Sequence, residues 1–185
     1  WVASGVALLA CVLATVPLIS AYGSLRVLLV VVVATLLGAG IAAVAALRSW
    51  SAIVTVAGVL AVHLVGGLVV VAPPRATGGV LDSVRVLLTG VVRSWKDALT
   101  VPAPLGSSAA VMVAPWVLAL AAGAVVVSLA VRGSNRIAVV AALVPLLVLG
   151  VSLVLTEQEA LAPAIVGIGV AALSAVAGAL LLRTF

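Results

Sequence analysis

Six long runs of apolar residues, separated mostly by short polar turns, make up most of this 185-residue chain. A transmembrane helix needs about 20 mostly apolar residues to cross roughly 30 Å of hydrocarbon, and each run is close to that length. The runs are apolar all round, which is typical of helices surrounded by lipid and by one another. The pattern therefore predicts an all-α, polytopic membrane helical bundle in one domain, with six transmembrane helices over residues 2–19, 25–47, 51–72, 110–131, 137–155 and 163–182.

The stretch between the third and fourth runs, residues 73–109, has a different pattern. Apolar residues recur there at spacings of three and four, which predicts one amphipathic helix over about residues 80–99. Its apolar positions are Leu81, Val84, Leu87, Leu88, Val91, Val92, Trp95 and Leu99. Its polar positions are Asp82, Arg85, Thr89, Arg93, Lys96 and Asp97. Such a helix either lies in the plane of the membrane interface or packs over the bundle with its apolar face against protein.

Composition supports a membrane protein. Hydrophobic residues make up 66% of the chain and charged residues 7%, whereas soluble domains carry about 25% charged residues. The net charge of +5 could suggest nucleic-acid binding, but the basic residues outside 73–109 lie singly near the ends of apolar runs. In such places basic residues set topology and contact lipid headgroups. We therefore expect membrane lipids as partners and no nucleic acid.

The basic residues of the short turns predict an orientation. Short cytoplasmic turns are enriched in Lys and Arg, so the membrane side with more of them is the inside. An arrangement with both ends inside gives the inner turns Arg48, Arg132, Arg136 and Arg183. The outer turns then hold Arg26, Glu157 and Glu159. The long outer segment with Arg75, Arg85, Arg93 and Lys96 counts against this arrangement, but it is partly neutralised by Asp82 and Asp97. We predict a bacterial plasma-membrane protein, N-in and C-in.

Small residues inside the runs predict where helices approach closely. Without a hydrophobic force between helices in lipid, association depends on close packing, which small residues permit. The candidate positions are Gly38-Ala39-Gly40, Gly66-Gly67, Gly167-Ile168-Gly169 and Gly178.

His63, in the third run, is the one histidine of the chain and the main candidate for an intramembrane polar site. Ionisable groups at this depth often serve as proton relays or ligands. However, no Asp, Glu, Lys or Arg occupies a comparable depth in any run. This favours a neutral imidazole bonded to a backbone carbonyl or to a hydroxyl such as that of Thr35.

Other reactive groups offer little chemistry. Cys11 is the single cysteine and is expected to be a buried small hydrophobe, because a Cys–His pair with His63 would lack an orienting third group. Glu157 and Glu159 lie in a short turn and are expected to be solvated, since acid–base work needs a cleft that separates two pKa values. The sequence predicts no catalytic, cofactor or metal site. The residues expected to contact a partner or lipid are Arg85, Arg93, Trp95 and Lys96.

The run Val92-Arg93-Ser94-Trp95-Lys96-Asp97-Ala98-Leu99-Thr100-Val101-Pro102-Ala103-Pro104-Leu105-Gly106, followed by Pro115 and Arg132, carries a resemblance. It is similar to the outer-loop segment in the N-terminal membrane domain of actinobacterial transglutaminase-like (TgpA-type) membrane proteins. Ala103 interrupts the pair of prolines found in that family. The order of apolar runs and the long loop is similar over the whole chain, but the similarity of individual residues is confined to about fifteen positions.

The resemblance implies a setting and partners. In that family further helices and an extracytoplasmic transglutaminase- or protease-like domain with a Cys-His-Asp site follow. Cys11 and His63 cannot supply that site because both lie in predicted spans. A MoxR-type ATPase, a von Willebrand-like protein and the extracytoplasmic catalytic domain are implied partners, in cell-envelope processing. This chain would be a non-enzymatic anchor or scaffold, with residues 73–109 as an outer docking surface.

A function of another class fits the same residues. A transporter or flippase-like subunit would use a kink at Pro145, Gly66-Gly67 and His63 to line a path through the bundle. Such a path needs polar residues facing one another across the bundle, and the apolar runs contain few of them.

Overall fold

The computed structural model describes residues 2–132, 139–156 and 163–183, and all its regular elements are helices. In chain order the elements are α1 (Val2–Ala14), α2 (Leu18–Tyr22), α3 (Arg26–Leu47), α4 (Ala52–Val70), α5 (Pro74–Thr77), α6 (Val80–Thr100), α7 (Ala109–Arg132), the 3₁₀ turn η1 (Ala141–Leu143), α9 (Val144–Thr156) and α10 (Pro163–Arg183). The predictions made for Arg136, Glu157 and Glu159 concern residues outside the described ranges, and the side chain of Arg183 also lies outside them.

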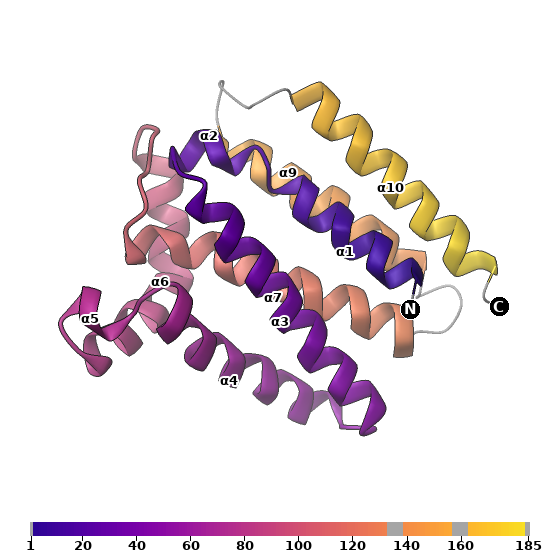
Figure 1. The fold of residues 1–185 in the computed structure, drawn as a ribbon, viewed down its shortest axis with the longest axis horizontal. Coiled ribbons are helices and arrows are strands. Elements are labelled where there is room, and N and C mark those ends of the chain that lie inside the picture. Colours follow the sequence, from indigo (N-terminus) through magenta and orange to yellow (C-terminus); the bar gives the residue numbers. More distant parts are fainter. Residues whose placement is uncertain (1, 133–138, 157–162, 184–185) are drawn as a thin grey trace.

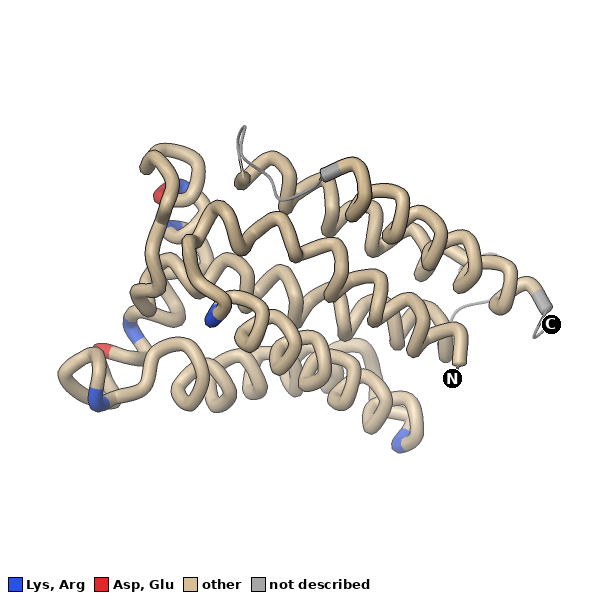
Figure 2. The backbone as a smooth tube through the Cα atoms, turned by 45° about the horizontal axis from the view of Figure 1, so that its top comes forward, with Lys and Arg blue, Asp and Glu red and all other residues tan. Residues whose placement is uncertain are grey.

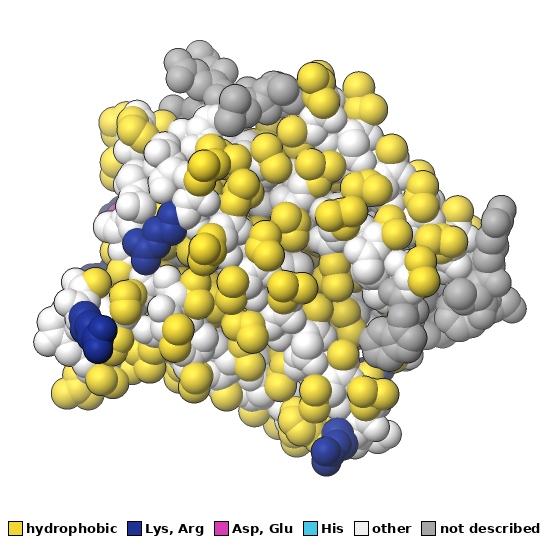
Figure 3. Space-filling view, viewed as in Figure 1, with side chains coloured by type: hydrophobic (Ala, Val, Ile, Leu, Met, Phe, Trp, Pro, Cys, Tyr) yellow, Lys and Arg dark blue, Asp and Glu magenta, His cyan; other side chains and the backbone are white. Residues whose placement is uncertain are grey.

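The long helices lie side by side along the longest axis of the molecule, with α4 at one edge and α10 at the other (Figure 1). α3 and α7 form the centre, and α1 and α9 lie between this centre and α10. α6 runs across one end of the bundle, next to the short α5, while Val2 and the end of α10 lie at the opposite end. The face seen in Figure 3 is largely hydrophobic, with Lys and Arg side chains visible only near the two ends.

Four of these helices are long and apolar enough to cross a membrane: Arg26–Leu47, Ala52–Val70, Ala109–Arg132 and Ala164–Leu182. They match the runs predicted at 25–47, 51–72, 110–131 and 163–182, and the helix predicted at 80–99 is confirmed as α6. Val2–Ala14 and Ala141–Thr156 are apolar but shorter.

The run predicted as one helix over 2–19 is instead divided into α1 and α2. Proline has no N–H and its ring collides with the preceding turn, so Pro17 cannot continue the hydrogen-bond ladder of α1. The chain passes through a turn at residues 15–17, where the Thr15 hydroxyl donates to the Val12 carbonyl at 2.7 Å. Pro17 then caps the start of α2.

Pro145 has a comparable effect on the fifth run. Its missing N–H would leave the Ala141 carbonyl without its helical partner four residues on. The structure places η1 directly before α9, and the Val144 N–H donates to the Ala141 carbonyl instead. This tighter turn satisfies the carbonyl and shortens α9.

The most extensive helix contact in the described chain joins α3 and α7. Gly38 on α3 faces the carbonyl oxygen of Leu120, and Gly123 on α7 faces the carbonyl oxygen of Thr35, so closely that a Cβ at either glycine would collide with backbone. Each glycine therefore accepts the backbone of the other helix. The predicted role of Gly38 is confirmed, whereas Gly40 has open space around it and Gly123 was not predicted.

A proline inside α7 is accommodated by a side chain from α2. Pro115 leaves the Val111 carbonyl without its N–H partner in the helix. The Tyr22 hydroxyl donates to that carbonyl at 3.2 Å. Tyr22 is 1% exposed, so this bond is buried and completes the hydrogen bonding of α7.

Two arginines join helix ends at opposite ends of the bundle. Arg26 donates to the carbonyls of Ser107, at 3.0 Å, and Val70, the last residue of α4, at 3.3 Å. Arg132 donates to the carbonyls of Ala45, in the last turn of α3, and Trp50, at 2.9 Å. The last carbonyls of a helix lack partners and carry partial negative charge, so a guanidinium satisfies and stabilises them. The two arginines therefore clamp α3, α4 and α7 together.

Replacing Gly38 with alanine tests the α3–α7 contact. We expect Gly38→Ala to lower the free energy of unfolding by roughly 1–3 kcal/mol, because the new methyl group meets backbone that cannot rotate away. Gly40→Ala is the matched control, on the same helix with nothing within 4 Å of its added methyl group. Unfolding in detergent, followed by circular dichroism, measures both. Equal stability of the two variants would contradict the contact.

Candidate functional site

The start of α6 is fixed by the turn that joins it to α5. Gly78 has a φ of 95°, a left-handed conformation that favours glycine, and Gly79 caps α6 without a side-chain hydrogen bond. The Thr77 and Ser83 hydroxyls are hydrogen-bonded to each other, and Ser83 Oγ donates to the Gly79 carbonyl at 3.0 Å. These bonds hold α5 against the first turn of α6.

One face of α6 packs against α7 and α4. Its buried residues, mostly small, are Ser83, Leu87, Gly90, Ser94 and Ala98. A Cβ on Gly90 would lie 2.7 Å from Val113 of α7, and one on Gly67 of α4 would lie 2.7 Å from the Leu87 side chain. The buried Ser94 hydroxyl is satisfied within α6 by the Gly90 carbonyl. Small residues thus permit a close approach of α6 to both helices.

The predicted apolar face of α6 is not the packing face. Leu87 is the one fully buried member of the predicted set, while Leu81 is 85% and Val92 75% exposed. At about 100° per residue, Val84, Leu88, Val91, Trp95 and Leu99 form a flank to one side of the buried stripe. We call these five residues the apolar flank. Three of them, Leu88, Val91 and Leu99, have exposed side chains, so the apolar flank is largely uncovered by the rest of the chain.

The charged residues of α6 lie on the other side of the buried stripe. Asp82, Arg85, Thr89, Arg93 and Lys96 are exposed, and we call them the charged flank. Within the described chain none of Arg85, Arg93 and Lys96 forms an ion pair, although Asp82–Arg85 and Arg93–Asp97 have helix-pair spacing. Figure 2 shows charges gathered at this end of the bundle. The predicted contact residues Arg85, Arg93 and Lys96 therefore share one accessible surface, and Trp95 lies on the apolar flank beside it.

The segment after α6 is docked onto the α2–α3 turn. The Leu105 N–H donates to the Ala21 carbonyl at 2.8 Å, and Arg26 holds the Ser107 carbonyl. Gly23 has a φ of 62°, and a Cβ there would lie 2.9 Å from Pro104. The residues that carry the family resemblance thus contact the first helices of the chain.

His63 lies on the narrow buried stripe of α4 with Thr55 and Gly67. It is 5% exposed, and its Nδ1 accepts a hydrogen bond from Trp116 Nε1 at 3.2 Å. Gly66 makes room for the Trp116 ring, because a Cβ there would lie 3.0 Å from it. A neutral imidazole with Nδ1 as acceptor carries its proton on Nε2. No partner of Nε2 meets the geometric criteria for a hydrogen bond, and the main chain of Leu87 lies beside the ring.

The expected bond between His63 and the Thr35 hydroxyl is wrong, whereas the backbone of Leu87 does lie next to the imidazole. The bond comes from Trp116, and the Thr35 hydroxyl has no hydrogen-bond partner. Cys11 is buried as expected, in a cluster with α9 and α10, whereas Trp116 and Leu87, which neighbour His63, belong to another cluster. The structure does not bring Cys11 and His63 together. Among the described residues no group of three or more His, Cys, Asp or Glu could hold a metal ion.

Three residues with clear roles were not singled out from the sequence: Trp116, Gly90 and Gly123. Trp116 is the largest fully buried side chain. Its place in the middle of an apolar run was the available signal, because tryptophans in membrane proteins are enriched at the interfaces instead. Gly90, inside an amphipathic helix, was a comparable signal of close approach.

No family model, curated protein or solved structure matches this chain. The resemblance drawn from Val92–Gly106 therefore stays a prediction.

A double-mutant cycle tests the Trp116–His63 bond. We expect Trp116→Phe to lower the free energy of unfolding by roughly 1–3 kcal/mol, because it leaves the buried His63 Nδ1 without its donor. His63→Leu should also destabilise, since it strands Trp116 Nε1. The free energy of unfolding lost by the double variant should be smaller than the sum of the two single losses, and the difference should be roughly 0.5–3 kcal/mol. Additive losses would show that the two side chains do not interact.

Proposed function

We propose that this chain is a non-catalytic membrane anchor and scaffold domain of a transglutaminase-like, TgpA-type cell-envelope protein. The observation that carries the proposal is α6, whose three faces have different surroundings. A small-residue face packs on the bundle, an apolar flank is exposed on one side, and a charged flank is exposed on the other. A helix that lies across the end of a membrane bundle with this division presents charge to water and apolar side chains to lipid.

The proposed placement has six membrane passes, with both ends inside a bacterial plasma membrane. Besides the four long helices, α1 with α2 and η1 with α9 would cross, since both lie alongside the longer helices (Figure 1). The sequence gives the inner side Arg48, Arg132, Arg136 and Arg183 and no acid. Among the short turns the outer side would hold Arg26 alone, and this four-to-one excess of inner cations supports the orientation, although residues 73–109 place four more cations outside.

The proposed docking surface is the charged flank within residues 73–109. Arg85, Arg93 and Lys96 project from a helix fixed at both ends and are not engaged by acidic residues of the described chain. Cations arranged on a rigid element steer and orient an acidic partner surface. The extracytoplasmic catalytic domain implied by the resemblance is the proposed partner, and a MoxR-type ATPase and a von Willebrand-like protein are the further proposed partners in the cell envelope.

A transporter or flippase-like subunit is the second candidate. The observation in its favour is the buried His63 with an unpartnered Nε2, since intramembrane ionisable groups often mark transport paths. The grooves found in the described bundle are lined almost entirely by apolar side chains, which supports the anchor instead. Loss of function in His63→Ala at unchanged abundance would favour transport.

Thiol labelling tests the orientation. In a Cys11→Ala background we expect Lys96→Cys to react with a membrane-impermeant maleimide on intact spheroplasts, because the charged flank would face outward. Arg48→Cys is the control: Arg48 is exposed directly after α3, at the end of the bundle away from α6 (Figure 1), and a cysteine there should react only after permeabilisation. The opposite pattern would reverse the proposed topology.

Crosslinking in the complete gene product tests the function. With a photoreactive amino acid at Arg93, we expect crosslinked peptides from a Cys-His-Asp domain encoded in the same reading frame. The same amino acid at Gly40, exposed on α3, is the control and should give none. A reading frame without such a domain, or identical products from both positions, would contradict the scaffold function.

A further inference from the structure

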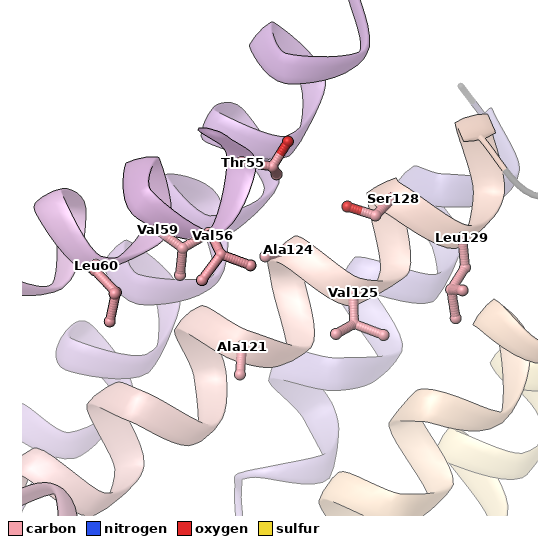
Figure 4. Close-up of a pocket in the computed structure, with 9 residues that line it drawn as sticks. All are labelled: Thr55, Val56, Val59, Leu60, Ala121, Ala124, Val125, Ser128 and Leu129. Atoms are coloured by element: carbon pink, nitrogen blue, oxygen red, sulfur yellow. The ribbon is translucent and has the colours of Figure 1, made fainter. Parts of the chain in front are cut away.

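A groove of about 310 Å³ runs along the bundle surface between α4 and α7 (Figure 4). Nine residues line it, from the first half of α4 and the second half of α7. All are apolar except Thr55 and Ser128, which lie at the same end of the groove (Figure 4). The groove therefore has a long apolar part and one polar end.

A cation lies at the polar end. Arg132 donates from Nη1 to the Thr55 hydroxyl at 3.3 Å. Its guanidinium has five N–H groups and makes three hydrogen bonds, to Thr55, Ala45 and Trp50, so donors are left for an anion. Arg132 is exposed, and the acids among the described residues, Asp82 and Asp97, are on α6 at the other end of the bundle. No carboxylate of the described chain therefore neutralises this charge.

A second groove of about 230 Å³ adjoins the first. It lies between α7 and α9, and the two share Ala121 and Val125 of α7 as lining residues. Two apolar grooves that flank Ala121 and Val125 of α7 could hold the two acyl chains of a diacyl lipid. Arg132, in the last turn of α7, would sit where a phosphate group lies, at the boundary of the hydrocarbon.

We propose that this surface is a binding site for an anionic diacyl phospholipid, with one acyl chain in the α4–α7 groove and the phosphate on Arg132. Charge complementarity selects this occupant: the apolar groove suits an acyl chain, and the guanidinium, which no carboxylate of the described chain neutralises, keeps two N–H groups free for phosphate oxygens. An uncharged transmembrane helix of a partner would leave Arg132 without an anion. The site requires the chain to be in a membrane, but it does not depend on the scaffold function.

Native mass spectrometry of the full chain tests the site. The probes are phosphatidylglycerol and phosphatidylcholine with the same palmitoyl and oleoyl chains. We expect retention of phosphatidylglycerol over phosphatidylcholine by the unmodified chain. Ala121→Phe should reduce that retention about tenfold, because Ala121 is exposed in the shared stripe and a phenyl ring there blocks both channels. Ala172→Phe, at an exposed alanine of α10, is the matched control and should leave retention unchanged.

Two further variants separate the charge from the groove. Arg132→Gln should abolish the preference for phosphatidylglycerol, whereas Arg48→Gln, which removes an exposed cation at the same end, should keep it. If Ala121→Phe does not fold, Val125→Phe blocks the same two grooves and replaces it. If Arg132→Gln does not fold, the comparison of the two lipids on the unmodified chain tests the charge. Equal retention of both lipids by the unmodified chain would overturn the proposal. So would undiminished retention by the folded Ala121→Phe or Val125→Phe variant, or a dimer that excludes lipid.

Discussion

The backbone contact between α3 and α7 is the constraint on which the rest of this structure depends. In lipid, apolar side chains gain little by leaving one apolar environment for another, so helices associate where their surfaces fit closely. Gly38 and Gly123 provide that fit by removing the two side chains that would hold the helices apart. With α3 and α7 in contact, Arg26 and Arg132 can reach the ends of α4 from opposite ends of the bundle.

The same packing rule positions α6. Glycine at residue 90 and serines at 83 and 94 allow the helix to lie directly on α7 and α4, although none of these residues belongs to its hydrophobic pattern. Because the contact uses small residues, most of the large apolar side chains and the charged ones stay exposed. Of the two placements considered from the sequence, the structure shows the cover over the bundle. The interfacial placement stays a proposal.

The sequence predicted the helices well where their apolar runs were uninterrupted, and it predicted α6 from its three-and-four periodicity. It was less informative about prolines. Pro17 divides the first apolar run into two helices, and Pro145 is preceded by a 3₁₀ turn. Pro115, in contrast, leaves α7 continuous, because the Tyr22 hydroxyl satisfies the carbonyl that Pro115 leaves without a partner. That compensation comes from a residue 89 positions away and cannot be seen in a local pattern. The Trp116 donor of His63 was missed for the same reason.

The face of α6 that contacts the bundle was missed for a different reason. We expected the large apolar residues of α6 to pack against protein, whereas the small residues do so.

The most direct test of the account is the accessibility of a spin label placed in turn at each position from Arg85 to Leu99 in vesicles, in a Cys11→Ala background. The account predicts three repeating environments along α6. Oxygen, which partitions into lipid, should collide most at Leu88, Val91 and Leu99, and a water-soluble nickel complex most at Arg85, Thr89 and Arg93. Labels at Gly90 and Ser94 should meet little of either reagent, because both positions are buried against the bundle. Equal accessibility to the nickel complex at all positions would show that α6 does not lie on the bundle at the membrane surface, and would contradict the account.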